Sequence, residues 1–204
     1  MALPATDAFT NSNGTSLTAH SGSWTAHTGA FVINSNQLAS NAASSDTLAF
    51  WNADTFDNDQ YAQATVTALS SPTQMGLAVR IANVGTKTFY GIAWDDVNLY
   101  FFKYVDGAGE LFDQSAAPSV GDVMRIEAEG TTIRVLKNGS ASGAPSPVTD
   151  TSIASGPAGI TGYNNATSNR IDNWEGGNLG GVAANIIYQR RMDGLGAFFR
   201  GMDS

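Results

Sequence analysis

Apolar and polar side chains alternate along much of this chain with a period of two. Met75, Leu77, Val79 and Ile81 are apolar at every second position, and the same rhythm runs through residues 62–68 and 124–128. Successive side chains of a β-strand point to opposite faces, so this period predicts strands with one buried face. Further strands are expected at residues 31–33, 47–51, 89–94, 99–105, 111–114, 132–137, 159–163 and 170–175.

The residues between these segments are turn formers. Gly130 separates two alternating runs at the spacing of a tight hairpin, and the pairs at 106–107 (Asp-Gly) and 138–139 (Asn-Gly) suit turns with positive φ. Helical periodicity is weak before residue 180. Many short strands at this spacing predict an all-β protein built as a two-sheet antiparallel sandwich.

The pattern changes after residue 177. We expect residues 1–177 to form the sandwich and residues 178–204 to form a C-terminal arm, either extended or a short helix. The arm holds three of the ten basic residues and two of the eighteen acidic ones. Apolar side chains exposed near a chain end usually mark a contact site. The expected assembly contacts are Ile186, Ile187, Tyr188, Arg190, Arg191, Phe198, Phe199 and Arg200.

Composition narrows the classes of partner. The formal net charge is −8, which argues against nucleic acid, because phosphate binding needs clusters of Lys and Arg. The absence of cysteine excludes disulfides and thiolate metal sites. The sequence has neither an apolar run long enough to span a membrane nor the basic and apolar regions of a signal peptide. We therefore expect no membrane insertion.

Residues 7–176 carry a family resemblance. The runs FYGIAW at 89–94 and LYFFK at 99–103 resemble the central hairpin of concanavalin A-like, laminin-G-like jelly rolls. The segments at 121–127, 132–139 and 171–174 are similar to later strands of that family, and Asp7-Ala8-Phe9 is similar to its first strand. The resemblance implies a concanavalin A-like jelly roll with a C-terminal extension, and it implies a role in phage structural proteins.

From this resemblance and the arm we expect a non-enzymatic structural or interaction protein. It would be a surface component of a phage virion, as a capsid decoration or a tail-associated protein. The arm would anchor it to other virion proteins or to copies of itself. The expected location is the virion, with an extracellular location as the alternative.

A carbohydrate-binding module that recognises a cell-surface glycan is the first alternative function. Such a module needs aromatic faces to stack on sugars and polar side chains to bond hydroxyl groups, and loops at strand ends often carry such sites. Aromatic residues of a sandwich are more often part of the core. The candidate glycan-binding residues are Trp94, Asp95, Asp96, Tyr163, Asn164 and Asn165.

A glycoside hydrolase is the second alternative, because the same fold hosts such enzymes. They need two carboxylates across the glycosidic bond. Glu127 and Glu129 are the nearest match, but their alternation predicts solvated carboxylates on a strand, so no catalytic residue is assigned. No metal site and no cofactor are expected from the residues. The resemblance leaves calcium open, near residues 54–59 or 95–96, although neither segment has the spacing of a calcium loop.

Overall fold

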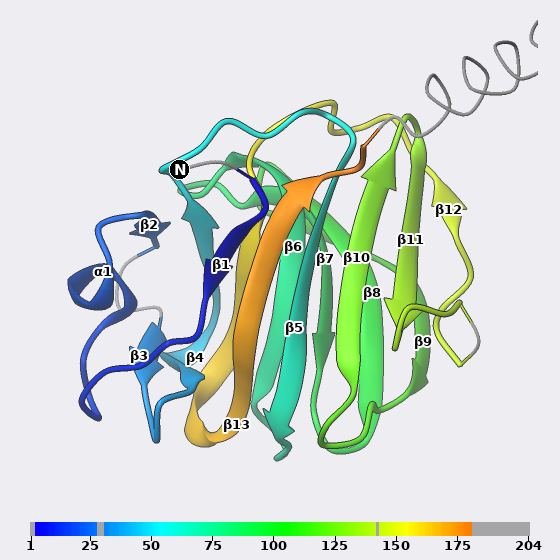
Figure 1. Ribbon diagram of the computed structural model, residues 1–204. Helices are drawn as coiled ribbons and strands as arrows, with labels where there is room; N and C mark the ends of the chain where they lie inside the picture. Colours follow the sequence, from blue (N-terminus) through cyan, green and yellow to red (C-terminus); the bar gives the residue numbers. More distant parts are fainter. Residues whose placement is uncertain (1–2, 28–30, 142, 181–204) are drawn as a thin grey trace, which may run out of the picture.

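The computed structural model describes residues 3–27, 31–141 and 143–180, without the side chains of residues 42–45 and 165–167. Within these residues the protein is almost entirely β (Figure 1). The elements in chain order are β1 (Ala5–Asp7), α1 (Leu17–His20), β2 (Trp24–Ala26), β3 (Phe31–Ile33), β4 (Leu38–Trp51), β5 (Gln60–Ala68), β6 (Gln74–Asn83), β7 (Thr88–Trp94), β8 (Asn98–Val105), β9 (Ala108–Ala116), β10 (Val123–Glu129), β11 (Thr132–Lys137), β12 (Val148–Thr149) and β13 (Gly159–Asn178).

The strands form two packed antiparallel layers that share β13 (Figure 1). The second half of β13 lies between β1 and β5, and β10, β11 and β12 follow β5; we call this layer the front sheet. The first half of β13 lies between β4 and β6, and β7, β8 and β9 follow β6; this layer, with β2 and β3 beside β4, is the rear sheet. The predicted all-β, two-sheet antiparallel jelly-roll sandwich is confirmed.

The core lies between the two sheets and follows the period of two. On β6 the side chains of Met75, Leu77 and Val79 are buried, and on β10 those of Met124 and Ile126 are buried against them from the front sheet. The predicted core-facing side chains are correct for these residues. Ile81 is the exception: Arg80 has a φ of 51° and the pairing of β6 with β7 shifts register after Val79, so Ile81 packs in a second buried cluster with Leu48 and Phe89.

Three tryptophans form the core at the β1 end of the sandwich. Trp24, Trp51 and Trp174 come from β2, β4 and β13, and their ring centroids lie 4.6–5.6 Å apart. Trp174, in the last strand, is fully buried. Their contacts join β2 and β4 to the last strand, β13. The rings are buried only when the two sheets pack together, since either sheet alone would leave them exposed.

The predicted turns are present. Gly130 has a φ of 55° in the hairpin between β10 and β11, and Asp106 and Gly107 have φ values of 49° and 83° between β8 and β9. The placement of the first strand at residues 7–9 is wrong. β1 ends at Asp7, because Asp7 accepts a hydrogen bond from the backbone N–H of Phe9, whose φ of 47° takes the chain out of the sheet.

The start of the predicted arm is bonded to the sandwich. Asn178 is the last residue of β13, and its side chain bonds to both the backbone and the carboxylate of Asp57. The next residue, Leu179, donates its N–H to the carbonyl of Asp59. The expected contact residues at positions 186–200 lie outside the described residues. In the part of the chain that is described, no helix is long and apolar enough to cross a membrane.

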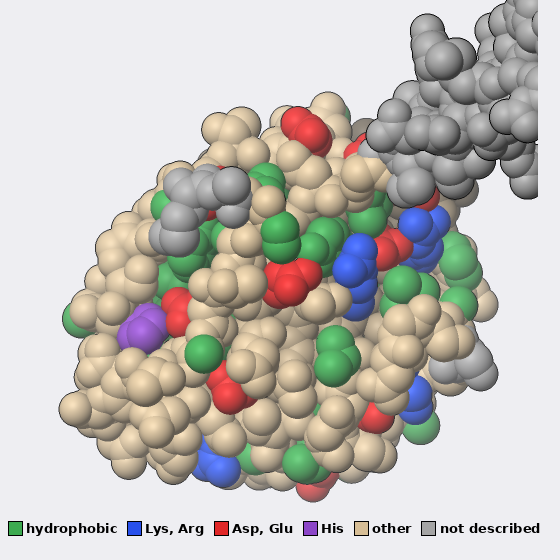
Figure 2. Space-filling view, viewed as in Figure 1, with side chains coloured by type: hydrophobic (Ala, Val, Ile, Leu, Met, Phe, Trp, Pro, Cys, Tyr) green, Lys and Arg blue, Asp and Glu red, His purple; other side chains and the backbone are tan. Residues whose placement is uncertain are grey.

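The outer face of the front sheet is polar, with acidic and basic side chains next to one another (Figure 2). Glu127 accepts hydrogen bonds from Arg125 and Arg134, and the Arg125 guanidinium lies 3.6 Å from the centre of the Tyr61 ring. Our prediction that Glu127 is a solvated carboxylate is wrong, because these two arginines cover it and leave it 4% exposed. Glu129 is paired with Arg134 and remains exposed.

Candidate functional site

The outer face of the rear sheet carries aromatic side chains. Leu99 and Phe101 of β8 point into the core, so the alternate residues Tyr100, Phe102 and Tyr104 point to the opposite face. Cross-strand pairing places these three rings beside Ala93, Gly91 and Phe89 of β7. An antiparallel sheet with a solvated outer face usually has polar residues there. This row of rings is therefore an exception that needs a functional or packing reason.

Small side chains lie beside the rings and leave room above the sheet. Thr161, Gly76 and Ala93 occupy one register row across β13, β6 and β7, next to Tyr100. The site excludes a larger residue at Gly76, since an added Cβ would lie 1.9 Å from the backbone oxygen of Ile92. The hydroxyl of Thr161 is held by the carbonyl of Thr47. These small, closely packed residues form the floor of the site.

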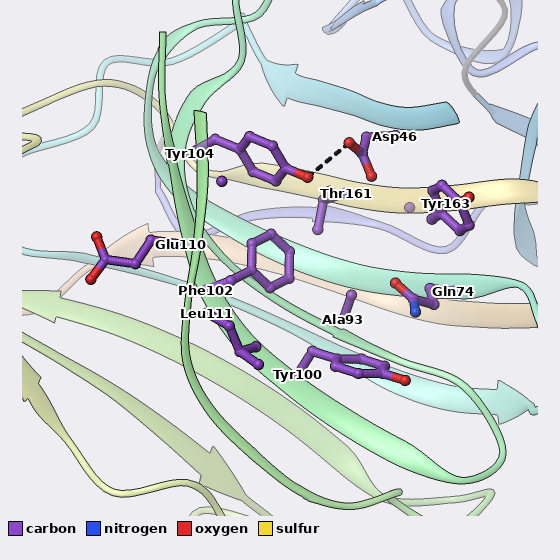
Figure 3. A pocket seen from close by; sticks show the side chains of 12 residues that line it. Asp46, Gln74, Ala93, Tyr100, Phe102, Tyr104, Glu110, Leu111, Thr161 and Tyr163 are labelled. Carbon is purple, nitrogen blue, oxygen red and sulfur yellow. Dashed lines mark hydrogen bonds between the residues drawn. The ribbon is translucent and has the colours of Figure 1, made fainter. Parts of the chain in front are cut away.

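Walls on both sides turn this floor into a pocket with a volume of about 280 Å³. We call it the outer pocket. Figure 3 shows the side chains of Tyr100, Phe102 and Thr161 around the space, with Tyr163 and Gln74 at the end away from Glu110. The lining residues are Asp46, Gln74, Ala93, Tyr100, Phe102, Tyr104, Gly109, Glu110, Leu111, Thr161, Gly162 and Tyr163.

The aromatic wall is fixed by ring packing. Tyr104 stacks on Phe89 with centroids 5.5 Å apart, and Phe102 meets both rings edge to face at 5.8–6.0 Å. Gly109 lies against Tyr104, where an added Cβ would be 3.0 Å from the ring. Because neighbours hold each ring in place, the wall loses little conformational entropy when a ligand binds.

A hydrogen bond joins the two sides of the pocket. The hydroxyl of Tyr104 on β8 donates to the carboxylate of Asp46 on β4 at 2.9 Å (Figure 3). The Lys87 ammonium lies 3.4 Å from the same oxygen. Burial, together with this acceptor, raises the pKa of Tyr104 to about 12. The phenol therefore stays protonated and keeps donating to Asp46 throughout the neutral pH range.

Tyr100 is positioned from the turn between β7 and β8. Its hydroxyl donates to Asp95 Oδ2 at 3.2 Å, while Asp95 Oδ1 accepts the backbone N–H groups of Val97 and Asn98. Asp95 is 5% exposed. It acts as a turn former that orients an aromatic side chain of the pocket, and its carboxylate is occupied by these bonds.

The structure brings only part of the expected glycan site together. Tyr163 lines the outer pocket, and Asp95 accepts a hydrogen bond from the hydroxyl of Tyr100, which also lines it. Asp96 is exposed in the turn between β7 and β8. The inclusion of Trp94 is wrong, because its side chain is fully buried on the core face. Asn164 adopts a φ of 69°, and its carbonyl accepts a hydrogen bond from Ser40. The side chain of Asn165 lies outside the described part of the structure.

Sequence reasoning missed most of the pocket. Phe102, Tyr104, Asp46, Gln74 and Thr161 line it, yet none was a candidate. A signal was present for the rings, because residues 99–102 are apolar or aromatic without a break, which is unusual for a strand with one solvated face. Asp46 had no such signal, since it stands in a segment of small polar residues.

The acidic segments considered for calcium serve local structure. Asp54 accepts the indole N–H of Trp51, and Asp59 accepts the backbone N–H of Gly130. Among the residues that the structure describes, no group of three or more His, Asp or Glu side chains is arranged to hold a metal ion. Of the two acidic residues that line the outer pocket, Asp46 is paired with Lys87, and Glu110, whose side chain points away from the other lining residues (Figure 3), is paired with Lys103.

Comparisons with solved structures identify the architecture. The carbohydrate-binding module CBM66 from Bacillus subtilis is 17% identical with a TM-score of 0.55, over 76% of this chain and 92% of that chain. The exoplasmic/lumenal domain of VIP36 in its Ca2+/Man-bound form is 9% identical with a TM-score of 0.59, over 79% and 85%. A Bacillus subtilis protein of unknown function with a galectin-like fold is 11% identical with a TM-score of 0.55, over 81% and 97%.

Sequence comparisons add no family. No protein-family model matches the chain, and a search of curated proteins gives no match either. The identities to the solved structures are low enough that they speak for the fold alone. The chain therefore has the jelly-roll β-sandwich fold of galectin-like and legume-lectin-like proteins.

Proposed function

We propose that this protein is a carbohydrate-binding module and that the outer pocket holds the sugar. The observation that carries the proposal is the set of aromatic rings on the outer face of the rear sheet. Tyr100, Phe102, Tyr104 and Tyr163 line one space together with the polar side chains of Gln74 and Asp46. A sugar ring presents apolar C–H faces and polar hydroxyl edges, so it matches walls of this mixed chemistry.

The solved structures of similar fold support the same function. One is described as a carbohydrate-binding module and another as a mannose-bound form. This favours glycan recognition over the virion-surface role. That role stays a prediction, because it depends on arm residues outside the described part of the chain.

The proposal includes binding without catalysis. Asp46 accepts a hydrogen bond from Tyr104, and Glu110 is paired with Lys103. Glu127 and Glu129 are on the outer face of the front sheet, on the other side of the sandwich from the pocket. Purified protein should therefore release no reducing sugar from the glycans that it binds.

A glycan array followed by titration calorimetry tests the function. The wild-type chain should bind selected glycans, and Tyr100→Ala and Tyr163→Ala should each weaken binding by about tenfold or more, which corresponds to ~1.4 kcal/mol. Tyr61→Ala is the matched control, because Tyr61 is on the outer face of the front sheet. If no glycan binds, or if the control variant loses affinity as strongly as the pocket variants, the proposal is wrong.

A further inference from the structure

The outer pocket is closed along one side by the hydrogen bond between Tyr104 and Asp46. These residues belong to β8 and β4, and the strands β7, β6 and β13 lie between them in the rear sheet. The two side chains therefore meet above the sheet rather than along it. Lys87 reinforces the contact, since its ammonium lies 3.4 Å from Asp46 and 5.7 Å from the centre of the Tyr104 ring.

Behind this bridge the outer face is filled. Leu48, Ala78, Ile81 and Phe89 form a second buried apolar cluster, separate from the main core, and Phe50, Val84, Phe102 and Tyr104 pack against it. Phe89 is fully buried although it is on the outer face of the sheet. A ligand cannot continue past Tyr104 without breaking up this cluster.

The remaining walls confine the ligand to a short length. Phe102 and Leu111 stand on the side of β8 and β9, and Asp46 and Tyr163 stand on the side of β4 and β13 (Figure 3). The volume of about 280 Å³ is near the lower end of the range of ~300–1,000 Å³ found for ligand pockets. This space suits a single sugar ring or a disaccharide.

We propose that the outer pocket recognises the end of a glycan chain and does not bind internal segments. This inference depends on the proposed carbohydrate function. A glycan bound through its middle needs an exit at both ends of the site. The hydrogen bond between Tyr104 and Asp46 and the cluster behind it close this pocket at one end. The terminal sugar of the glycan would enter the pocket with its ring toward Tyr104, and the rest of the glycan would extend away from the pocket into solvent.

The test compares short and long forms of the same glycan. The probes are linear β-1,3-glucan, β-1,4-mannan and inulin, each as a short oligosaccharide and as a long polymer, titrated at equal concentrations of chains. For whichever probe binds, wild-type protein should show one protein per chain in both forms, with affinities equal within about twofold. A stoichiometry that rises with chain length would overturn end recognition and leave the carbohydrate function intact.

Opening the bridge should change this behaviour. Tyr104→Ala removes the ring that closes the pocket, and Asp46→Ala removes its partner, so the long polymer should then bind more than one protein per chain. Tyr61→Ala should keep the wild-type stoichiometry, because its ring is on the front sheet. Unfolding midpoints of all variants confirm that they are folded. If wild-type protein binds neither these probes nor any glycan of the array, the carbohydrate function fails and this inference falls with it.

Discussion

Asp150 links the two sheets at the open edge of the sandwich, and its replacement by asparagine should destabilise the fold. It follows β12 of the front sheet and accepts hydrogen bonds from the hydroxyl of Tyr90 on β7 and the ammonium of Lys103 on β8, each at 2.6 Å. It also accepts the N–H of Ser152 at 2.8 Å. The Tyr90 hydroxyl in turn accepts the N–H of Ile153. One carboxylate thus holds the segment after β12 against the rear sheet.

The size of the effect follows from these contacts. An asparagine side chain at this position would keep one acceptor oxygen, so Asp150→Asn removes the charge and at least one of the bonds. Hydrogen bonds to charged groups contribute roughly 1.5–3 kcal/mol each, and the Asp150 side chain is 14% exposed, which limits screening by solvent. We expect the substitution to lower the free energy of unfolding by about 2 kcal/mol, which corresponds to a fall of roughly 4–8 °C in Tm for a domain of this size.

The effect should depend on pH with a defined sign. Burial alone would raise the pKa of Asp150, but the bonds from Lys103, Tyr90 and Ser152 hold that pKa well below its usual range. Because the folded-state pKa is depressed, the stabilisation is complete above the unfolded value of about 3.9 and is lost as the pH falls further. The difference between wild type and Asp150→Asn should therefore be full at pH 7 and clearly smaller at pH 2.

Urea unfolding followed by tryptophan fluorescence measures this difference, because all four tryptophans are buried. Asp96→Asn is the control: it makes the same change of charge at an exposed turn residue and should leave stability unaltered. If Asp150→Asn unfolds at the same urea concentration as wild type at pH 7, the carboxylate does not tie the sheets together and the reasoning is refuted.

Two further substitutions separate the pocket from the front sheet. Gly91→Ala places a Cβ 2.8 Å from the Phe89 ring and 3.0 Å from the Phe102 ring, so it should shift the aromatic wall and weaken glycan binding severalfold in calorimetry. Gly22→Ala, where the added Cβ meets nothing within 4 Å, should not. Glu127→Gln leaves Arg125 and Arg134 without their shared carboxylate and should lower the free energy of unfolding by about 2 kcal/mol, since both arginines are partly exposed. Its glycan affinity should stay that of wild type, and a loss of affinity would mean that the front sheet contributes to the site.

The strands were predictable wherever large apolar residues alternate with smaller or polar ones. The period marked both strands and the core-facing residues of β10 and of β6 as far as Val79, and Gly130 and Gly107 marked the turns. The first half of β4 was missed because its small polar residues show no period that could distinguish a strand from a loop. Its pairing with β13 supplies the order that its own sequence does not encode.

The bridge between Tyr104 and Asp46 could not be predicted in the same way. The two residues are 58 positions apart and belong to strands that are not neighbours in the sheet. They meet because a twisted sheet brings distant parts of its face together, and this depends on the path of every strand between them. Local pattern carries no information of that kind.

The error at Trp94, by contrast, could have been avoided from the sequence alone. Ile92 and Trp94 are two residues apart on one strand and must share a face, so a buried Ile92 places Trp94 in the core. The same parity assigns Tyr100, Phe102 and Tyr104 to the face opposite Leu99 and Phe101. An aromatic set on each face of one strand means that both faces are covered. In this sandwich the core covers one face. On the other face Phe102 and Tyr104 pack against the second cluster, and the same two rings line the outer pocket.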